Sequence, residues 1–85
     1  MKIDRQLQTA REHHRAGRLP QAEAIYREIL SVRPDHAEAL HWLGMLALQK
    51  GDKASASKYL TQLLSVDPIS AEAALAKATL DQLNR

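Results

Sequence analysis

Apolar residues recur along the chain at intervals of three and four positions, and short breaks divide them into five segments. In the second segment, apolar side chains fall on one face of a helix, while glutamate and arginine fall on the other. This spacing is typical of amphipathic helices, and no segment shows the alternation of period two that indicates a strand. The pattern predicts an all-α chain with five helices, at about 4–16, 20–32, 36–50, 53–66 and 71–83.

The breaks carry residues that end and begin helices. Gly17 and Gly51 follow the first and third segments, where glycine closes a helix in the left-handed conformation. Pro34 biases the residue before it away from helical dihedral angles, so the second helix should end there. Asp35 is placed to cap the third helix, and Glu38 would complete a capping box.

The third segment is apolar around nearly its whole circumference, unlike the second and the fourth. A helix with such a surface is buried on more than one side. We therefore expect this helix at the centre of the fold, with neighbours before and after it.

The sequence also repeats itself with a period of 34 residues, two helices to each unit, which is typical of tetratricopeptide repeats. The matching positions are Gly17, Ala22, Tyr26 and Pro34 in the first unit and Leu43, Gly44, Gly51, Ala56, Leu60 and Pro68 in the second. Over residues 3–83 the chain resembles the tetratricopeptide repeat family. The resemblance implies one domain over 1–85, an α-helical solenoid of two antiparallel helix-turn-helix units (about 3–34 and 37–68) and a C-terminal capping helix (about 71–83).

The repeat has a physical reason in side-chain size. Gly44, and Ala10 in the first unit, are small enough for the two helices of a unit to pack closely. The larger Tyr26 and Leu60 should fill the space between adjacent units. Two units and a cap fall short of the three repeats usually needed for independent stability, so self-association or truncation from a longer chain stays open.

Composition limits the class of protein. A chain of 85 residues forms one small domain, with no room for a two-lobed enzyme. Cysteine is absent, which excludes disulfides and thiolate chemistry. No stretch is long and apolar enough for a membrane span, and the first residues lack the apolar region of a secretory signal. The expected location is the cytoplasm.

Charge adds one alternative. The net charge is only +2, but residues 1–18 hold five Lys and Arg against two acidic residues. A basic first helix attracts acidic peptides or nucleic acid. A solvated outer face explains the same charges more simply, so nucleic acid is the less favoured partner.

No catalytic or metal-binding pattern emerges. No serine lies in a nucleophile-elbow setting, and the three glycines do not cluster into a phosphate loop. His36 and His41 are five residues apart, a poor spacing for one metal ion, and His13 and His14 are neighbours that point apart on a helix. The sequence predicts no enzyme, no cofactor and no metal.

The resemblance to tetratricopeptide repeats implies a concave groove, lined by the first helices of successive units, that receives a peptide or a partner helix. The partner-binding residues predicted in this way are Leu7, Arg11, His14, Arg15, Glu38, His41, Trp42, Met45 and Gln49. The same transfer adds Asp4, Gln8, Glu72, Leu75, Ala76, Thr79 and Gln82 to the lining. Tryptophan and methionine suit binding surfaces, although Trp42 and Met45 could equally pack between the repeats.

We therefore predict a non-catalytic scaffold that binds a protein or peptide partner. The groove favours an apolar anchor near Trp42 and an acidic group near Arg11 and Arg15. The alternatives are an N-terminal repeat segment of a larger enzyme or assembly, a self-associating homodimer, and a weak nucleic-acid binder that uses the basic first helix.

Overall fold

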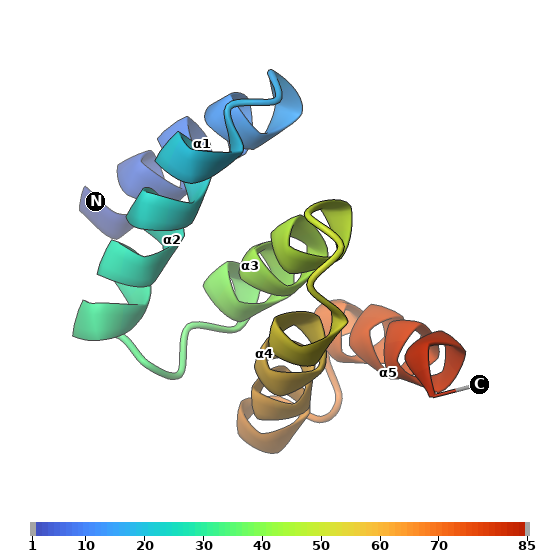
Figure 1. Ribbon diagram of the computed structural model, residues 1–85. Helices are drawn as coiled ribbons and strands as arrows, with labels where there is room; N and C mark the ends of the chain where they lie inside the picture. The colour runs from blue at the N-terminus through green and yellow to red at the C-terminus, as the bar shows by residue number, and fades with distance from the viewer. Residues whose placement is uncertain (1, 85) are drawn as a thin grey trace.

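The computed structural model describes residues 2–84, which form five helices joined by short turns (Figure 1). These helices are α1 (Lys2–Arg15), α2 (Leu19–Val32), α3 (Ala37–Gln49), α4 (Lys53–Val66) and α5 (Ala71–Leu83). The predicted all-α class and the five helices are confirmed. No helix within residues 2–84 combines the length and the apolar character that crossing a membrane requires.

The turns inside the two units are built alike. Gly17 and Gly51 have φ angles of +83° and +81°, a region that other residues rarely adopt. After α1, the N–H of Arg18 donates to the carbonyl oxygen of His13 at 2.9 Å, and the same bond recurs 34 residues later at 2.8 Å. This pattern is a Schellman motif, which satisfies the last carbonyl groups of a helix and reverses the chain.

The cap of α3 differs from the prediction. The ring Nδ1 of His36, and not the carboxylate of Asp35, accepts the N–H of Ala39 at 3.2 Å. Asp35 lies one residue too early to cap a helix that begins at residue 37, and it faces Arg33 at 3.7 Å instead. Ser70 caps α5 with its hydroxyl in the usual way.

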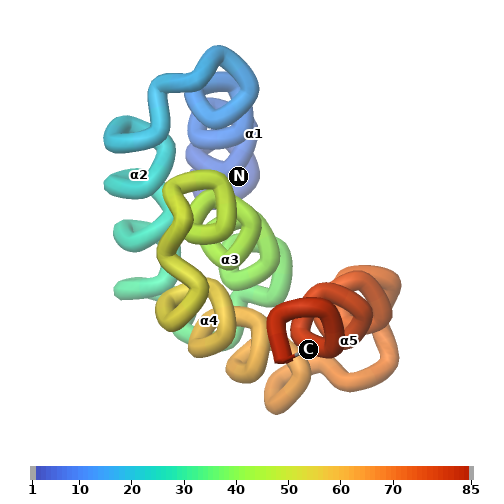
Figure 2. Tube along the Cα trace, turned by 45° about the vertical axis from the view of Figure 1, so that its right-hand side comes forward, coloured from blue at the N-terminus to red at the C-terminus, as the bar shows by residue number. Residues whose placement is uncertain are grey.

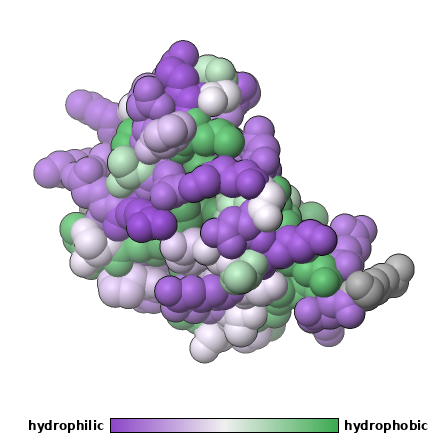
Figure 3. All heavy atoms as spheres, in the orientation of Figure 1, coloured by the Kyte–Doolittle hydropathy of each residue, from purple (hydrophilic) through white to green (hydrophobic). Residues whose placement is uncertain are grey.

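The helices follow one another in two rows. α1, α3 and α5 lie along one side of the molecule, and α2 and α4 lie along the other (Figure 2). α3 packs against all four other helices, which confirms its predicted central place. Hydrophilic side chains cover most of the face drawn in Figure 3, with smaller apolar areas between them.

The buried side chains form two clusters that meet at α3. The first joins α1, α2 and α3 around Tyr26, and the second joins α3, α4 and α5 around Leu60. Tyr26 and Leu60 stand 34 residues apart and both are fully buried. Each therefore fills the junction between its own unit and the first helix of the next.

Gly44 marks the closest approach of α3 and α4. A Cβ atom placed on Gly44 would lie 2.8 Å from Cδ2 and 2.9 Å from Cγ of Leu60. Carbon atoms normally stay about 3.5–4.0 Å apart, so a side chain at this position does not fit without movement. In α1 the equivalent residue is Ala10, which is fully buried.

Two residues of α5 that the family pattern placed in the groove differ in burial. Ala76, placed in the groove by the family pattern, is buried in the second cluster with Leu60. Leu75, which the same pattern placed in the lining, is 57% exposed. The equivalent residues Leu7 and His41 are covered because the next first helix packs over them, and within residues 2–84 no helix follows α5.

Candidate functional site

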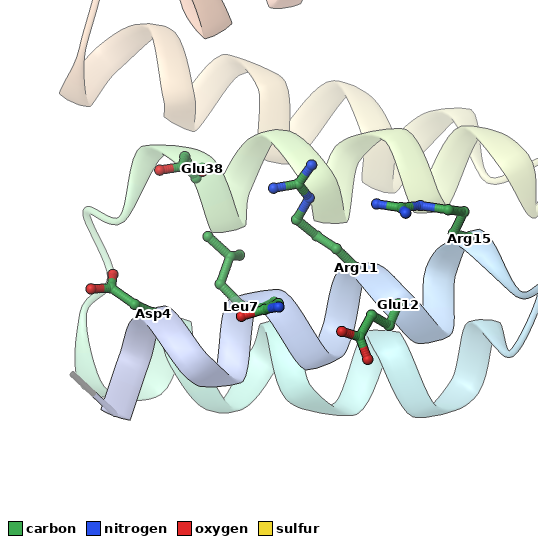
Figure 4. Close-up of a pocket in the computed structure, with 7 residues that line it drawn as sticks. Asp4, Leu7, Arg11, Glu12, Arg15 and Glu38 are labelled. Atoms are coloured by element: carbon green, nitrogen blue, oxygen red, sulfur yellow. The ribbon is translucent and has the colours of Figure 1, made fainter.

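α1 and α3 frame a groove of about 460 Å³. Its lining residues are Asp4, Leu7, Gln8, Arg11, Glu12, Arg15 and Glu38 (Figure 4). Sequence reasoning placed all of them there except Glu12, whose carboxylate turns away from α3. Leu7 is nearly buried and forms an apolar floor between the charged side chains. The groove exists because α1 and α3 are the first helices of adjacent units and meet only along one edge.

Arg11 crosses this groove from α1 toward α3 (Figure 4). Its guanidinium carbon lies 4.9 Å from the centre of the Trp42 ring, a cation–π contact. Its Nε atom is buried and has no hydrogen-bond partner. A buried donor without an acceptor is rare in proteins and costs about 1–3 kcal/mol. Sequence reasoning did not find this contact, because the two residues are 31 positions apart.

Trp42 lies partly in the core and partly at the surface of a cavity. Part of its surface packs against the first core cluster. Another part lines a small cavity of about 140 Å³ together with Arg11, His14 and Arg15. Met45, one turn further along α3, is half-buried. The indole therefore packs between the two units and also lines the small cavity beside the groove.

His14 and Gln49, both predicted to bind a partner, contact each other. His14 Nε2 lies 2.8 Å from the amide oxygen of Gln49, and Nδ1 lies 3.3 Å from the hydroxyl of Tyr26. An amide oxygen only accepts, so Nε2 carries the proton and Nδ1 accepts from the tyrosine. Burial raises the pKa of Tyr26 to about 12, although the charge of Arg11 opposes this shift. The three side chains tie α1, α2 and α3 together.

His41 is not an open groove residue. It is only 8% exposed, its ring centre lies 5.1 Å from that of Trp42, and the helix that carries it packs against α5. Burial lowers the pKa of His41 below its ordinary value, while the carboxylates of Glu72 and Glu38 act in the opposite direction. The neutral ring is therefore favoured, and unlike Leu7 it does not line the groove.

The side chains of the groove are arranged as a surface that another chain can contact. Within residues 2–84, no three histidine, aspartate or glutamate side chains gather closely enough to hold a metal ion. The groove presents a pair of arginines, an apolar floor and two carboxylates near the start of the helices, and the indole of Trp42 lines the cavity beside it. Such a surface can hold a chain segment through ion pairs and apolar contact.

Comparison with known proteins gives a family and a set of distant relatives. A family model described as tetratricopeptide repeat matches residues 13–82. Cellulose synthase operon protein C of Komagataeibacter xylinus is 32% identical over 57 residues, which is 67% of this chain and 4% of that protein. The protein of the same name from Komagataeibacter sucrofermentans matches with the same identity and coverage. The chain thus spans about 4% of the length of these relatives.

Proposed function

Because the chain belongs to the tetratricopeptide repeat family, we propose that it is a non-catalytic module that binds a segment of a partner protein in the groove between α1 and α3. Arg11 carries this proposal, since its guanidinium is held in place over Trp42 while the side chain lines the groove. A carboxylate from a partner would approach an arginine that is already positioned and needs little further ordering.

Arg15 extends the same basic surface. It lies one turn beyond Arg11, is exposed, and lines both the groove and the small cavity beside Trp42. Among the side chains of residues 2–84, neither arginine pairs with an aspartate or glutamate. Both charges are therefore available to a partner, and desolvation at the indole edge would strengthen the contact.

Nucleic acid is the less favoured partner of this groove. Asp4 and Glu38 line the same space as the arginines. A phosphate backbone carries a regular series of negative charges, which these carboxylates would repel. A protein segment can instead place acidic, apolar and basic groups in different parts of the groove.

Selection of random peptides on the immobilised protein tests the proposal. We expect enriched peptides whose affinity falls about tenfold with Arg15→Glu, since a charge reversal replaces attraction by repulsion. Arg5→Glu is the matched control, because Arg5 is an exposed residue of the same helix that does not line the groove. Peptides that bind both variants like the wild type would place the binding surface elsewhere and refute the proposal.

A second candidate function is assembly, and Leu75 is the observation that favours it. This side chain is 57% exposed at the place where the equivalent Leu7 is covered by the next unit. The relatives are named as products of cellulose synthase operons, so the alternative is a repeat segment within a larger enzyme or assembly. If α5 meets a second copy of this chain through Leu75, light scattering from micromolar to millimolar protein should show a mass that rises above 9.5 kDa.

Two variants separate this assembly from unspecific association. Leu75→Lys should return the protein to a single mass, because a charge replaces the apolar contact. Val32→Lys is the matched control, since Val32 is 68% exposed at the end of α2, away from α5. A wild-type mass that stays constant over the whole range would remove self-association as a function.

A further inference from the structure

The charges of the groove between α1 and α3 are sorted along its length. Asp4 and Glu38 lie at one end, close to the first turns of α1 and α3 (Figure 4). Arg11 and Arg15 lie toward the other end, and Leu7 stands between the two pairs. Glu12 also lines the groove beside the arginines, but its carboxylate turns away from α3 (Figure 4). The other charged side chains of the groove are therefore acidic at one end and basic at the other, with the apolar Leu7 between them.

The helix dipole explains only part of this order. Acidic residues in a first turn and a basic residue in a last turn complement the partial charges of a helix. Asp4, Glu38 and Arg15 fit that rule. Arg11 does not, because it lies in the interior of α1 and is instead directed across the groove onto Trp42. Its position is set by the indole and not by the helix dipole.

Neither end neutralises the other. Within the described part of the chain, Asp4, Glu38, Arg11 and Arg15 take part in no ion pair, while the pairs that do form join other side chains. The distance along α1 explains this separation. From Asp4 to Arg11 the helix rises about 10 Å, and from Asp4 to Arg15 about 16 Å, at about 1.5 Å per residue.

We propose that the groove selects a partner segment by the order of its charges: an acidic group at Arg11 and Arg15, an apolar residue over Leu7, and a basic group between Asp4 and Glu38. An extended chain advances about 3.3 Å per residue, so the acidic and basic groups should stand about three to five residues apart. This inference rests on the proposed function and adds the chemistry of the partner to it. The chain direction of the segment is free, since side chains carry the recognition.

The experiment pairs each end of the groove with one charge of a bound peptide. The probe is a peptide enriched on the wild-type protein, together with two copies of it in which either its acidic residue or its basic residue is replaced by glutamine. The protein variants are Arg15→Glu for the basic end and Glu38→Gln for the acidic end, both at exposed positions. Arg5→Glu again serves as the control for charge alone.

We expect Arg15→Glu to lower the affinity for the parent peptide about tenfold. The affinity for the copy without its acidic residue should hardly change. Glu38→Gln should lower the affinity for the parent peptide by a smaller factor. It should leave the affinity for the copy without its basic residue unchanged. Thermal melts of each variant confirm that the fold is intact before binding is compared.

The outcomes separate this inference from the proposed function. If no peptide is enriched, or if neither variant changes binding, the proposed function fails and the charge order fails with it. Both variants could weaken binding by the same factor whichever charge of the peptide is removed, or the enriched peptides could carry acidic residues alone. In either case the groove binds partners without selecting the order of their charges. That second result would overturn the inference and leave the proposed function standing.

Discussion

Gly44→Ala tests the packing on which the whole repeat depends. The added methyl group would lie 2.8 Å and 2.9 Å from two side-chain atoms of Leu60, well inside normal contact distance. Because Leu60 is fully buried, it cannot turn into solvent to make room. The methyl group therefore has to push α3 and α4 apart or force Leu60 out of its preferred rotamer.

Two opposing terms decide the size of the effect. Overpacking of this kind costs about 1–3 kcal/mol. Replacing glycine by alanine inside a helix returns about 1 kcal/mol through helix propensity. We expect a net loss of up to about 2 kcal/mol in the free energy of unfolding, and for a domain of this size each kcal/mol lowers the melting temperature by about 4–8 °C.

The assay is thermal and urea unfolding followed by circular dichroism, in the wild-type and the Leu60→Ala backgrounds. Leu60→Ala removes both clashing atoms, so Gly44→Ala should there become neutral or stabilising by about 1 kcal/mol. Leu60→Ala itself costs about 2–5 kcal/mol, so all four proteins are compared in a stabilising osmolyte. An equal effect of Gly44→Ala in both backgrounds, or a wild-type protein stabilised by it, would refute the close approach of α3 and α4.

The remaining predictions concern a buried histidine and a helix cap. The pKa of His41 is lowered in the folded state, so its contribution to stability is present above the ordinary pKa of 6.5 and is lost as the pH falls below it. His41→Leu places the residue type of Leu7 at this position. Between about pH 8 and pH 5, the free energy of unfolding in urea should therefore fall less for this variant than for the wild type. Equal falls for the two proteins would contradict the burial of a neutral ring. Ser70→Ala removes the hydroxyl that accepts the N–H of Ala73 and should cost about 1 kcal/mol by the same assay. Ser65→Ala, at an exposed position in the last turn of α4, is its control, and equal stability of the two variants would contradict the cap.

Much of the fold could be predicted because its signals are local in sequence. Each signal acts within a few residues: the left-handed glycines at residues 17 and 51, the breaks at Pro34 and Pro68, and the apolar stripes. Together they locate five helices. The cap of α3 shows the limit of such signals. Asp35 and His36 are adjacent, and the exact residue at which α3 begins decides which of them accepts the first N–H groups.

The candidate site was less accessible to sequence reasoning because its contacts join distant residues. The family pattern indicated which faces of α1 and α3 line a groove, and Arg11, Arg15 and Glu38 do line it. It could not show that Arg11 rests on Trp42, or that Gln49 is held by His14 from another unit. These contacts depend on the rotation and spacing of whole helices.

The sequence by itself determined the helices, their turns and their 34-residue period, because hydrophobic spacing and backbone preference are properties of short segments. Only the tertiary structure decided which side chains are covered. Leu7, His41 and Leu75 hold equivalent places in the repeat, yet the first two are buried and the third is exposed. The difference arises because the next first helix covers α1 and α3 but, within the described residues, not α5, and burial depends on a neighbour that the segment itself does not encode.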